Sequence, residues 1–358
     1  MTSSQQPGED RAAPVAAPVD EGAEAAGSRT LGFSFTGRGP DYFRIWITNI
    51  ALSILTLGVY SAWAKVRTRR YFHGHTRLDG ASFAYTADPV KVLAGRTIAA
   101  AVLTVYVVTS FFEPAFEGVF WLLFLFALPS LVVRAHRFSA HHTRYRGLRF
   151  GFDGAYGEAA RAFILGPTVA MLSLGTLIPW SECRRQRFVL GSFSFGTTGF
   201  TTEVGARTFY KVYAKSGAVA ALVVAVSIAI GVLTTTVGEV ALAGAALALS
   251  AGVPFVVATL RAGLTNELWN GTRVDTHRFR STLSAPELGW IYLSNLVATM
   301  LTLGLYYPFA RVRIARYRAE HMTVTTDGDL DEFVAAAHDD VAATGEEMSD
   351  LFDIDIGI

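Results

Sequence analysis

The chain has 358 residues, of which 51% are hydrophobic and only 17% charged, and its formal net charge at pH 7 is +1. This composition is more apolar than that of an ordinary soluble protein. The single cysteine, Cys183, excludes an intramolecular disulfide and a cysteine-based metal site.

The two ends of the chain differ from its middle in charge. Residues 1–30 are polar, with five acidic and two basic side chains, and show no signal-peptide pattern. Residues 327–358 carry eleven acidic and no Lys or Arg side chains. By difference, 31–326 holds 29 basic and 14 acidic residues, a net charge of +15. We predict disordered tails at 1–30 and 327–358 around a membrane domain at 31–326.

Long stretches without charge recur along the middle segment. In chain order they are Ile45–Ala64, Thr97–Phe112, Gly118–Val133, Ala162–Ser181, Ser216–Gly238, Val240–Leu260 and Leu288–Ala310. Most are long enough to cross roughly 30 Å of hydrocarbon as a helix. Seven such runs exceed what a soluble core needs, so we expect an all-α polytopic membrane protein.

Three segments, 33–71, 150–188 and 279–317, align with one another without a gap. We predict that they are copies of one repeat unit, separated by transmembrane hairpins at 92–133 and 213–260. Each copy has an acid near the start of its apolar run, then a Gly, an aromatic residue and two Arg. The matched candidate residues are Gly58, Gly175 and Gly304; Trp63, Trp180 and Phe309; Arg67, Arg184 and Arg313; and Arg70, Arg187 and Arg316.

Each matched position has a physical interpretation. The acid suits a helix N-terminus, and the Gly of Thr56-Leu57-Gly58 and its counterparts allows the helix to bend. The aromatic residue suits the membrane interface, and the Arg pair can meet anionic lipid headgroups. The middle copy departs from the others, because Glu182 stands where the first has Lys65.

Two topologies are open. All seven runs could cross the membrane, but some basic loops would then lie outside, against the positive-inside rule. If each repeat unit instead re-enters or lies in the interface, only the two hairpins cross, four times in total, and both tails are cytoplasmic. We favour this second topology. Short strands at Ser82–Thr86 and Ser192–Phe195 are predicted to form a small cytoplasmic sheet.

The stretch from Thr56 to Arg67, TLGVYSAWAKVR, followed by Arg70 and Tyr71, resembles the YjgN-like family of bacterial inner-membrane proteins. The flanking FSFTG at 33–37, FGFDG at 150–154 and RYRG at 144–147 fit the same pattern, and the resemblance covers about 31–326. It implies a multi-pass protein of the bacterial inner membrane. It implies no catalytic residue, because the family has no established reaction.

No catalytic, cofactor-binding or metal-binding motif stands out. There is no phosphate-binding Gly-Lys-Ser/Thr loop and no nucleophile elbow, so we expect no enzyme and no cofactor. The expected partners are membrane lipids, with anionic headgroups at the cytoplasmic face, and a protein partner for the acidic tail, but no nucleic acid. Two functions remain open: a channel, transporter or lipid-handling protein, or a non-catalytic scaffold or envelope-maintenance protein that uses the basic face and the acidic tail.

Overall fold

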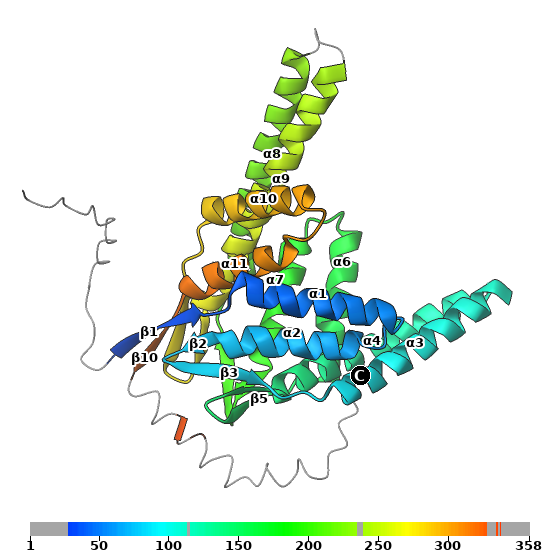
Figure 1. Ribbon diagram of the computed structural model, residues 1–358, viewed down its shortest axis with the longest axis vertical. Coiled ribbons are helices and arrows are strands. Elements are labelled where there is room, and N and C mark those ends of the chain that lie inside the picture. The colour runs from blue at the N-terminus through cyan, green and yellow to red at the C-terminus, as the bar shows by residue number, and fades with distance from the viewer. Residues whose placement is uncertain (1–27, 113–114, 235–238, 328–333, 336, 338–358) are drawn as a thin grey trace, which may run out of the picture.

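A computed structural model describes residues 28–112, 115–234, 239–327, 334, 335 and 337 (Figure 1). Within these residues, ten strands close into an antiparallel barrel in the order β1-β10-β9-β8-β7-β6-β5-β4-β3-β2. The strands are β1 Ser28–Phe35, β2 Thr76–Leu78, β3 Ala81–Tyr85, β4 Thr143–Tyr145, β5 Leu148–Phe152, β6 Phe193–Phe195, β7 Thr198–Thr202, β8 Thr272–Val274, β9 His277–Ser281 and β10 Met322–Asp327.

Helical hairpins leave one end of this barrel. The helices are α1 Gly39–Leu55, α2 Ser61–His75, α3 Pro89–Phe112, α4 Ala115–His141, α5 Tyr156–Ala160, the π-helix η1 Arg161–Leu165, α6 Gly166–Leu172, α7 Ile178–Gly191, α8 Ala206–Leu233, α9 Glu239–Asn270, α10 Ala285–Leu301 and α11 Tyr307–Glu320. The π-helix ends two residues before Pro167, which has no N–H to continue a regular helical ladder.

Strand hairpins and helical hairpins alternate along the described chain, so that each helical hairpin begins and ends on the barrel. Neighbouring helical hairpins also pack on each other: α2 on α3, α4 on α5, α7 on α8, α9 on α10, and α11 back on α1. The result is a closed ring of helical hairpins above a closed ring of strands. Tight turns with positive φ, such as Asp79-Gly80 and Arg146-Gly147, connect strands at the far end.

The strand register places a belt of apolar side chains inside the barrel. Five pairs of facing residues on neighbouring strands stand at one level, and each pair includes a Phe. The pairs are Phe33 with Leu78, Phe83 with Tyr145, Phe150 with Phe195, Phe200 with Val274, and Phe279 with Val324. Most of these side chains belong to one hydrophobic cluster, because alternate residues of a strand share a face.

Two of the helical hairpins are long. Four helices in the described residues are long and apolar enough to cross a membrane: Pro89–Phe111, Phe116–His141, Ala206–Leu233 and Ala241–Asn270. They form the pairs α3–α4 and α8–α9, which leave the barrel in different directions (Figure 1). Large apolar side chains such as Trp121 and Phe126 are exposed on them, as expected of surfaces that face lipid.

The other three helical hairpins are short, because a turn interrupts the apolar run. Helix α1 ends at Leu55 and α2 begins at Ser61; the same break separates α6 from α7 and α10 from α11. Each break lies at the Gly-containing tripeptide that the sequence marked as a bend.

The three turns share one hydrogen-bond pattern. Gly58, Gly175 and Gly304 donate their N–H to the carbonyl five residues earlier, at 2.7–2.9 Å, the bond typical of a Schellman helix end. The hydroxyl of the tripeptide accepts the N–H four residues later: Tyr60 N to Thr56 Oγ1 is 2.9 Å, and Leu177 N to Ser173 Oγ is 3.0 Å. The turn therefore ends one helix and is bonded to the residue that precedes the next helix.

The expectation of an all-α fold was wrong. The short strands predicted near 82–86 and 192–195 are present as β3 and β6, but they belong to a closed barrel of ten strands rather than a small sheet. Several strands have only three residues, such as Thr76–Leu78. A strand of three residues is too short for the two-residue alternation that identifies a strand in a sequence.

The predicted tails fall largely outside the described residues, at 1–27 and at 328–333, 336 and 338–358. Strand β1 begins at Ser28, within the predicted N-terminal tail, and pairs with β10 so that Ser28 faces Asp327. Val334 and Ala337 are buried against the barrel core.

Candidate functional site

The three candidate glycines lie at the tips of the short hairpins and do not come together. Gly58, Gly175 and Gly304 have φ of +92°, +85° and +93°, and the preceding leucines also have positive φ. Those leucines, Leu57, Leu174 and Leu303, are 95–96% exposed. Each tip thus presents an apolar side chain held out by a backbone geometry that favours glycine.

The candidate aromatic residues begin the second helix of each short hairpin. Trp63 stacks on Tyr60 with 6.1 Å between ring centroids, and Phe309 stacks on Tyr306 at 5.6 Å. Trp180 lies under the guanidinium of Arg184, 5.4 Å from its centroid. These rings therefore pack beside their own turns.

The candidate arginines also stay apart, around the ring. Arg70 donates to the carbonyl of Ala87 at 2.9 Å, and Arg316 donates to the carbonyl of Gly37 at 3.0 Å. Both acceptors stand four residues after a belt phenylalanine, in the loop that enters the next hairpin. This arginine position therefore joins neighbouring hairpins at two places in the ring.

The remaining candidate arginines have other surroundings. Arg313 donates to Ser294 Oγ at 2.8 Å and to Asn295 Oδ1 at 3.3 Å. Arg67, Arg184 and Arg187 are exposed. The tyrosine after Arg70 binds the loop that precedes α1. The hydroxyl of Tyr71 accepts from Arg38 N and donates to Arg38 O, both at 2.8 Å. The middle segment has Phe188 there, which has no hydroxyl to form these bonds.

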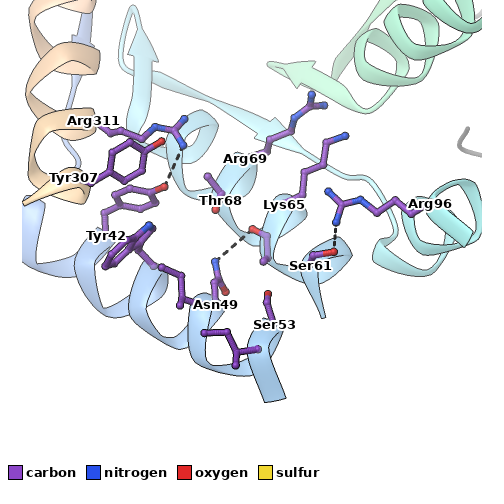
Figure 2. Close-up of a pocket in the computed structure, with 14 residues that line it drawn as sticks. Tyr42, Asn49, Ser53, Ser61, Lys65, Thr68, Arg69, Arg96, Tyr307 and Arg311 are labelled. Atoms are coloured by element: carbon purple, nitrogen blue, oxygen red, sulfur yellow. Dashed lines mark hydrogen bonds between the residues drawn. The ribbon is translucent and has the colours of Figure 1, made fainter. Parts of the chain in front are cut away.

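A basic cleft of about 680 Å³ lies between α1 and α2, with contributions from α3 and α11 (Figure 2). Four cationic side chains line it: Lys65 and Arg69 from α2, Arg96 from α3 and Arg311 from α11. No acidic residue is among the described residues that line it. The other lining residues are Tyr42, Trp46, Asn49, Ile50, Ser53, Ile54, Ser61, Ala64, Thr68 and Tyr307.

Hydrogen bonds hold three of these cations in place. Arg69 donates to the hydroxyls of Tyr85 and Ser139 at 2.8 and 3.0 Å. Arg96 donates to Ser61 Oγ, and Arg311 donates to the Tyr42 hydroxyl at 3.3 Å (Figure 2). These acceptors are neutral hydroxyls, so the positive charge of the cleft is not cancelled by them.

The electrostatics of Lys65 reflect this excess of positive charge. Partial burial lowers the pKa of Lys65, and the nearby Arg69 and Arg96 lower it further. Like charges disfavour the protonated amine. An anion bound among these side chains would relieve that repulsion.

Asn49 provides a second polar feature of the cleft. Its side chain is only 6% exposed, and its Nδ2 donates to the carbonyl of Ala64 at 3.4 Å. Its Oδ1 is buried and has no hydrogen-bond partner among the described residues. A buried acceptor without a partner is uncommon, and here it lines the cleft.

One matched position in the three segments indicated this cleft, but it was not among the candidate residues chosen from the sequence. Lys65, Glu182 and Arg311 each stand 32 residues after the phenylalanine that begins their segment. Lys65 and Arg311 thus occupy equivalent positions and meet in the cleft. In the middle segment Glu182 pairs with Arg185 at 2.6 Å. Arg96 comes from a long hairpin, so no comparison among the three segments indicated it.

Comparisons with known proteins address the membrane location. The chain is 24% identical over 363 residues to the inner membrane protein YjgN of Salmonella typhimurium strain LT2, covering 83% of this chain and 88% of that protein. It is 29% identical over 151 residues to YjgN of Escherichia coli K12, covering 40% and 37%. No solved structure matches.

A family model described as "Bacterial protein of unknown function (DUF898)" matches residues 30–351. This match covers most of the chain, and the relatives above are named inner membrane proteins. With its four membrane-capable helices, the chain is a membrane protein that belongs to the DUF898 family and is similar to the inner membrane protein YjgN.

Proposed function

We propose that this protein handles anionic phospholipids, with the basic cleft as the headgroup site. The observation that carries the proposal is the convergence of Lys65, Arg69, Arg96 and Arg311 on a cleft with no acidic lining residue among those described. Arg and Lys are the side chains that bind phosphate, through charge-assisted hydrogen bonds. This choice falls within the broader class of channel, transporter or lipid-handling protein.

The surroundings of the cleft favour a lipid over a soluble phosphate. Ile54 lines the cleft and is 70% exposed, and the adjacent tip carries Leu55 and Leu57, at 77% and 96% exposed. The apolar surface of this tip therefore continues from the basic cleft. A phospholipid has a matching arrangement: its anionic headgroup would lie in the basic cleft and its acyl chains along the apolar tip.

We further propose a topology in which the two long hairpins cross the membrane and the barrel lies in the cytoplasm. The short hairpins then enter the inner leaflet with their leucine tips and return. The net charge of +15 on 31–326 favours a cytoplasmic position for the basic loops. The pairing of β1 with β10 brings the starts of both tails together, which supports placing both tails on one side.

We also propose that the three short hairpins descend from one repeat unit of about 39 residues, at 33–71, 150–188 and 279–317. The shared turn supports this proposal, as do the tyrosine bonds of the first and third segments. The acids at the helix starts, Asp41, Glu158 and Glu287, lie in the first turn of their helices.

A lipid-binding measurement tests the headgroup site. The double variant Lys65→Gln with Arg311→Gln is reconstituted in nanodiscs, and bound phosphatidylglycerol is counted by native mass spectrometry against phosphatidylcholine. We expect affinity for the anionic lipid to fall roughly 25-fold, because each basic side chain near a membrane contributes about 1 kcal/mol.

Arg67→Gln is the matched control, because Arg67 is exposed on the same helix and does not line the cleft. An equal loss in this control would show that general charge, and not the cleft, attracts the lipid. Retained affinity in the double variant would reject the headgroup site and leave the scaffold function as the better candidate.

A labelling experiment tests the topology. Cys183 is buried, and burial raises the pKa of its thiol, so it is first replaced by Ala. A new cysteine is then placed at Gln186, which lies on the cytoplasmic side in the proposed topology. A membrane-impermeant maleimide should label it only after the membrane is opened; labelling of intact cells from outside would reject the arrangement.

A further inference from the structure

The interior of the barrel is a second cavity, distinct in its lining from the basic cleft. It measures about 550 Å³ and is lined mainly by aromatic and aliphatic side chains, including the six belt phenylalanines and Trp269. A cavity of this size, mostly apolar with a few polar groups, is typical of a small-molecule site. Barrels of this general size can enclose a ligand rather than filling completely with side chains.

The belt gives the cavity a continuous aromatic wall. Phe33 and Phe83 stack at 6.3 Å between ring centroids, Phe83 and Phe150 at 6.4 Å, and Phe200 and Phe279 at 6.0 Å, while Phe150 and Phe200 are tilted at 6.5 Å. All of the neighbours in this series lie two strands apart around the barrel. The wall therefore offers ring faces and edges along most of its circumference, which favours a flexible apolar molecule.

The two ends of the cavity differ. At the turn end, the buried Val334 and Ala337 pack in the same hydrophobic cluster as Leu78, Tyr145 and Leu148. At the helix end, the lining comes from the last turns of α2 and α11 and from Trp269 of α9. Access from the turn end is therefore restricted, and the cavity faces the helices.

Two polar side chains of the lining, His73 and Arg318, lie at the helix end. Burial lowers the pKa of His73, so this imidazole is mostly neutral at pH 7. Arg318 is exposed and has no hydrogen-bond or ion-pair partner among the described residues. It thus offers a fixed positive charge at the mouth of an apolar chamber.

We propose that the barrel lumen binds an acyl chain, with Arg318 at the mouth recognising the anionic group of the same molecule, the carboxylate of a fatty acid or the phosphate of a phospholipid. The chain lies against the phenylalanine belt, and the closed turn end limits how far it enters. A free fatty acid and a phospholipid acyl chain share this chemistry. The site is separate from the headgroup cleft, because Arg318 and the belt do not line that cleft.

Photo-crosslinking tests the proposal in nanodiscs that hold the full-length protein. Two probes carry a diazirine near the end of the acyl chain: a C16 fatty acid and a phosphatidylglycerol. After irradiation, labelled peptides are mapped by mass spectrometry. We expect at least one probe to label the belt strands β3 to β7, and the probe that does so identifies the source of the chain.

Variants that fill the lumen provide the decisive comparison. Val274→Trp adds a large side chain to the belt and should reduce belt labelling at least fivefold. Val102→Trp is the control, because Val102 is 50% exposed on the long helix α3. Should Val274→Trp fail to fold, as judged by circular dichroism and gel filtration, Val324→Phe fills the same belt with a smaller change.

Arg318→Gln tests the recognition of the end group. It should reduce belt labelling by the anionic probe that labels the wild type, by roughly fivefold. If the fatty acid is that probe, labelling by the corresponding alcohol should be the same in Arg318→Gln as in the wild type, because the alcohol carries no charge.

Belt peptides left unlabelled by both probes, or labelling that persists unchanged in both filled variants, would overturn the proposal. Lys65→Gln with Arg311→Gln should leave lumen labelling by the fatty acid intact, so the two sites can fail independently.

Discussion

The long hairpins α3–α4 and α8–α9 and the three short hairpins leave the same barrel by the same kind of connection, but they end differently. The apolar run Leu288–Ala310 of a short hairpin has 23 residues, more than the 16 of Thr97–Phe112 in a long one. Yet α10 ends at Leu301 and the chain turns back, whereas α3 runs unbroken from Pro89 to Phe112. The length of an apolar run therefore does not decide how far a helix extends, because a turn motif within the run can end it.

The two kinds of hairpin are also held together differently. In α8–α9, small residues allow close helix contact: a Cβ at Gly252 would overlap Val223, and one at Gly263 would lie 2.7 Å from Val212 Cγ1. This is the packing expected of helices within a membrane. The short hairpins rely instead on the turn and on tyrosine or arginine bonds to the loops.

The largest expected effect comes from closing the space between α8 and α9. Gly252→Leu should destabilise the protein by about 1–3 kcal/mol or more, because the added side chain collides with Val223. The loss is measured by thermal unfolding in nanodiscs. Gly217→Leu on α8 is the control, since a Cβ there meets nothing within 4 Å; similar losses in both variants would argue against close packing of this pair.

A smaller effect is expected at the tips of the short hairpins. Gly304→Ala should cost about 1–2 kcal/mol, because φ of +93° strains an L-residue even where space is open. Gly74→Ala in the last turn of helix α2 should be neutral or stabilising by up to about 1 kcal/mol, because Ala has a higher helix propensity than Gly and a Cβ there meets nothing within 4 Å. Chemical unfolding monitors both. An unchanged stability in Gly304→Ala would mean that the turn can adopt another geometry.

Removal of one tyrosine hydroxyl should weaken the third short hairpin. The Tyr317 hydroxyl accepts from Ser284 N at 2.9 Å and donates to Ser284 O at 3.2 Å. Tyr317→Phe should cost about 1 kcal/mol and speed hydrogen exchange at Ser284. The middle segment, where Phe188 stands naturally, supplies the comparison: exchange at its matching loop should not change. Equal exchange at Ser284 in variant and wild type would show that these bonds contribute little.

The smallest effect concerns pH. Burial lowers the pKa of His73 below its usual value of 6.5. The unfolded chain therefore takes up a proton first as the pH falls, so this residue contributes stability above pH 6.5 that is lost at lower pH. Between pH 7.5 and 5.5, the melting temperature of His73→Gln should fall less than that of the wild type. Equal falls would contradict a buried, neutral His73.

Some features of this protein follow from local sequence. The tripeptides at 56–58, 173–175 and 302–304 predicted a bend, because a glycine weakens the interior of a helix. The acids Asp41, Glu158 and Glu287 predicted helix starts, and the structure places them in first turns. Each of the four membrane-capable helices contains a long apolar stretch, so local composition identifies them.

The barrel and both cavities were decided by tertiary structure. Strands as short as Thr76–Leu78 carry no readable period, and their partners lie far along the chain, as Phe83 and Tyr145 do. The basic cleft joins Lys65 to Arg311, 246 residues apart, and adds Arg96 from a long hairpin. Local preference fixes where a helix or turn begins and ends, because its hydrogen bonds join near neighbours. Closure of the barrel joins residues that are distant in the sequence. Only the packing of all the helical hairpins around it determines which side chains meet.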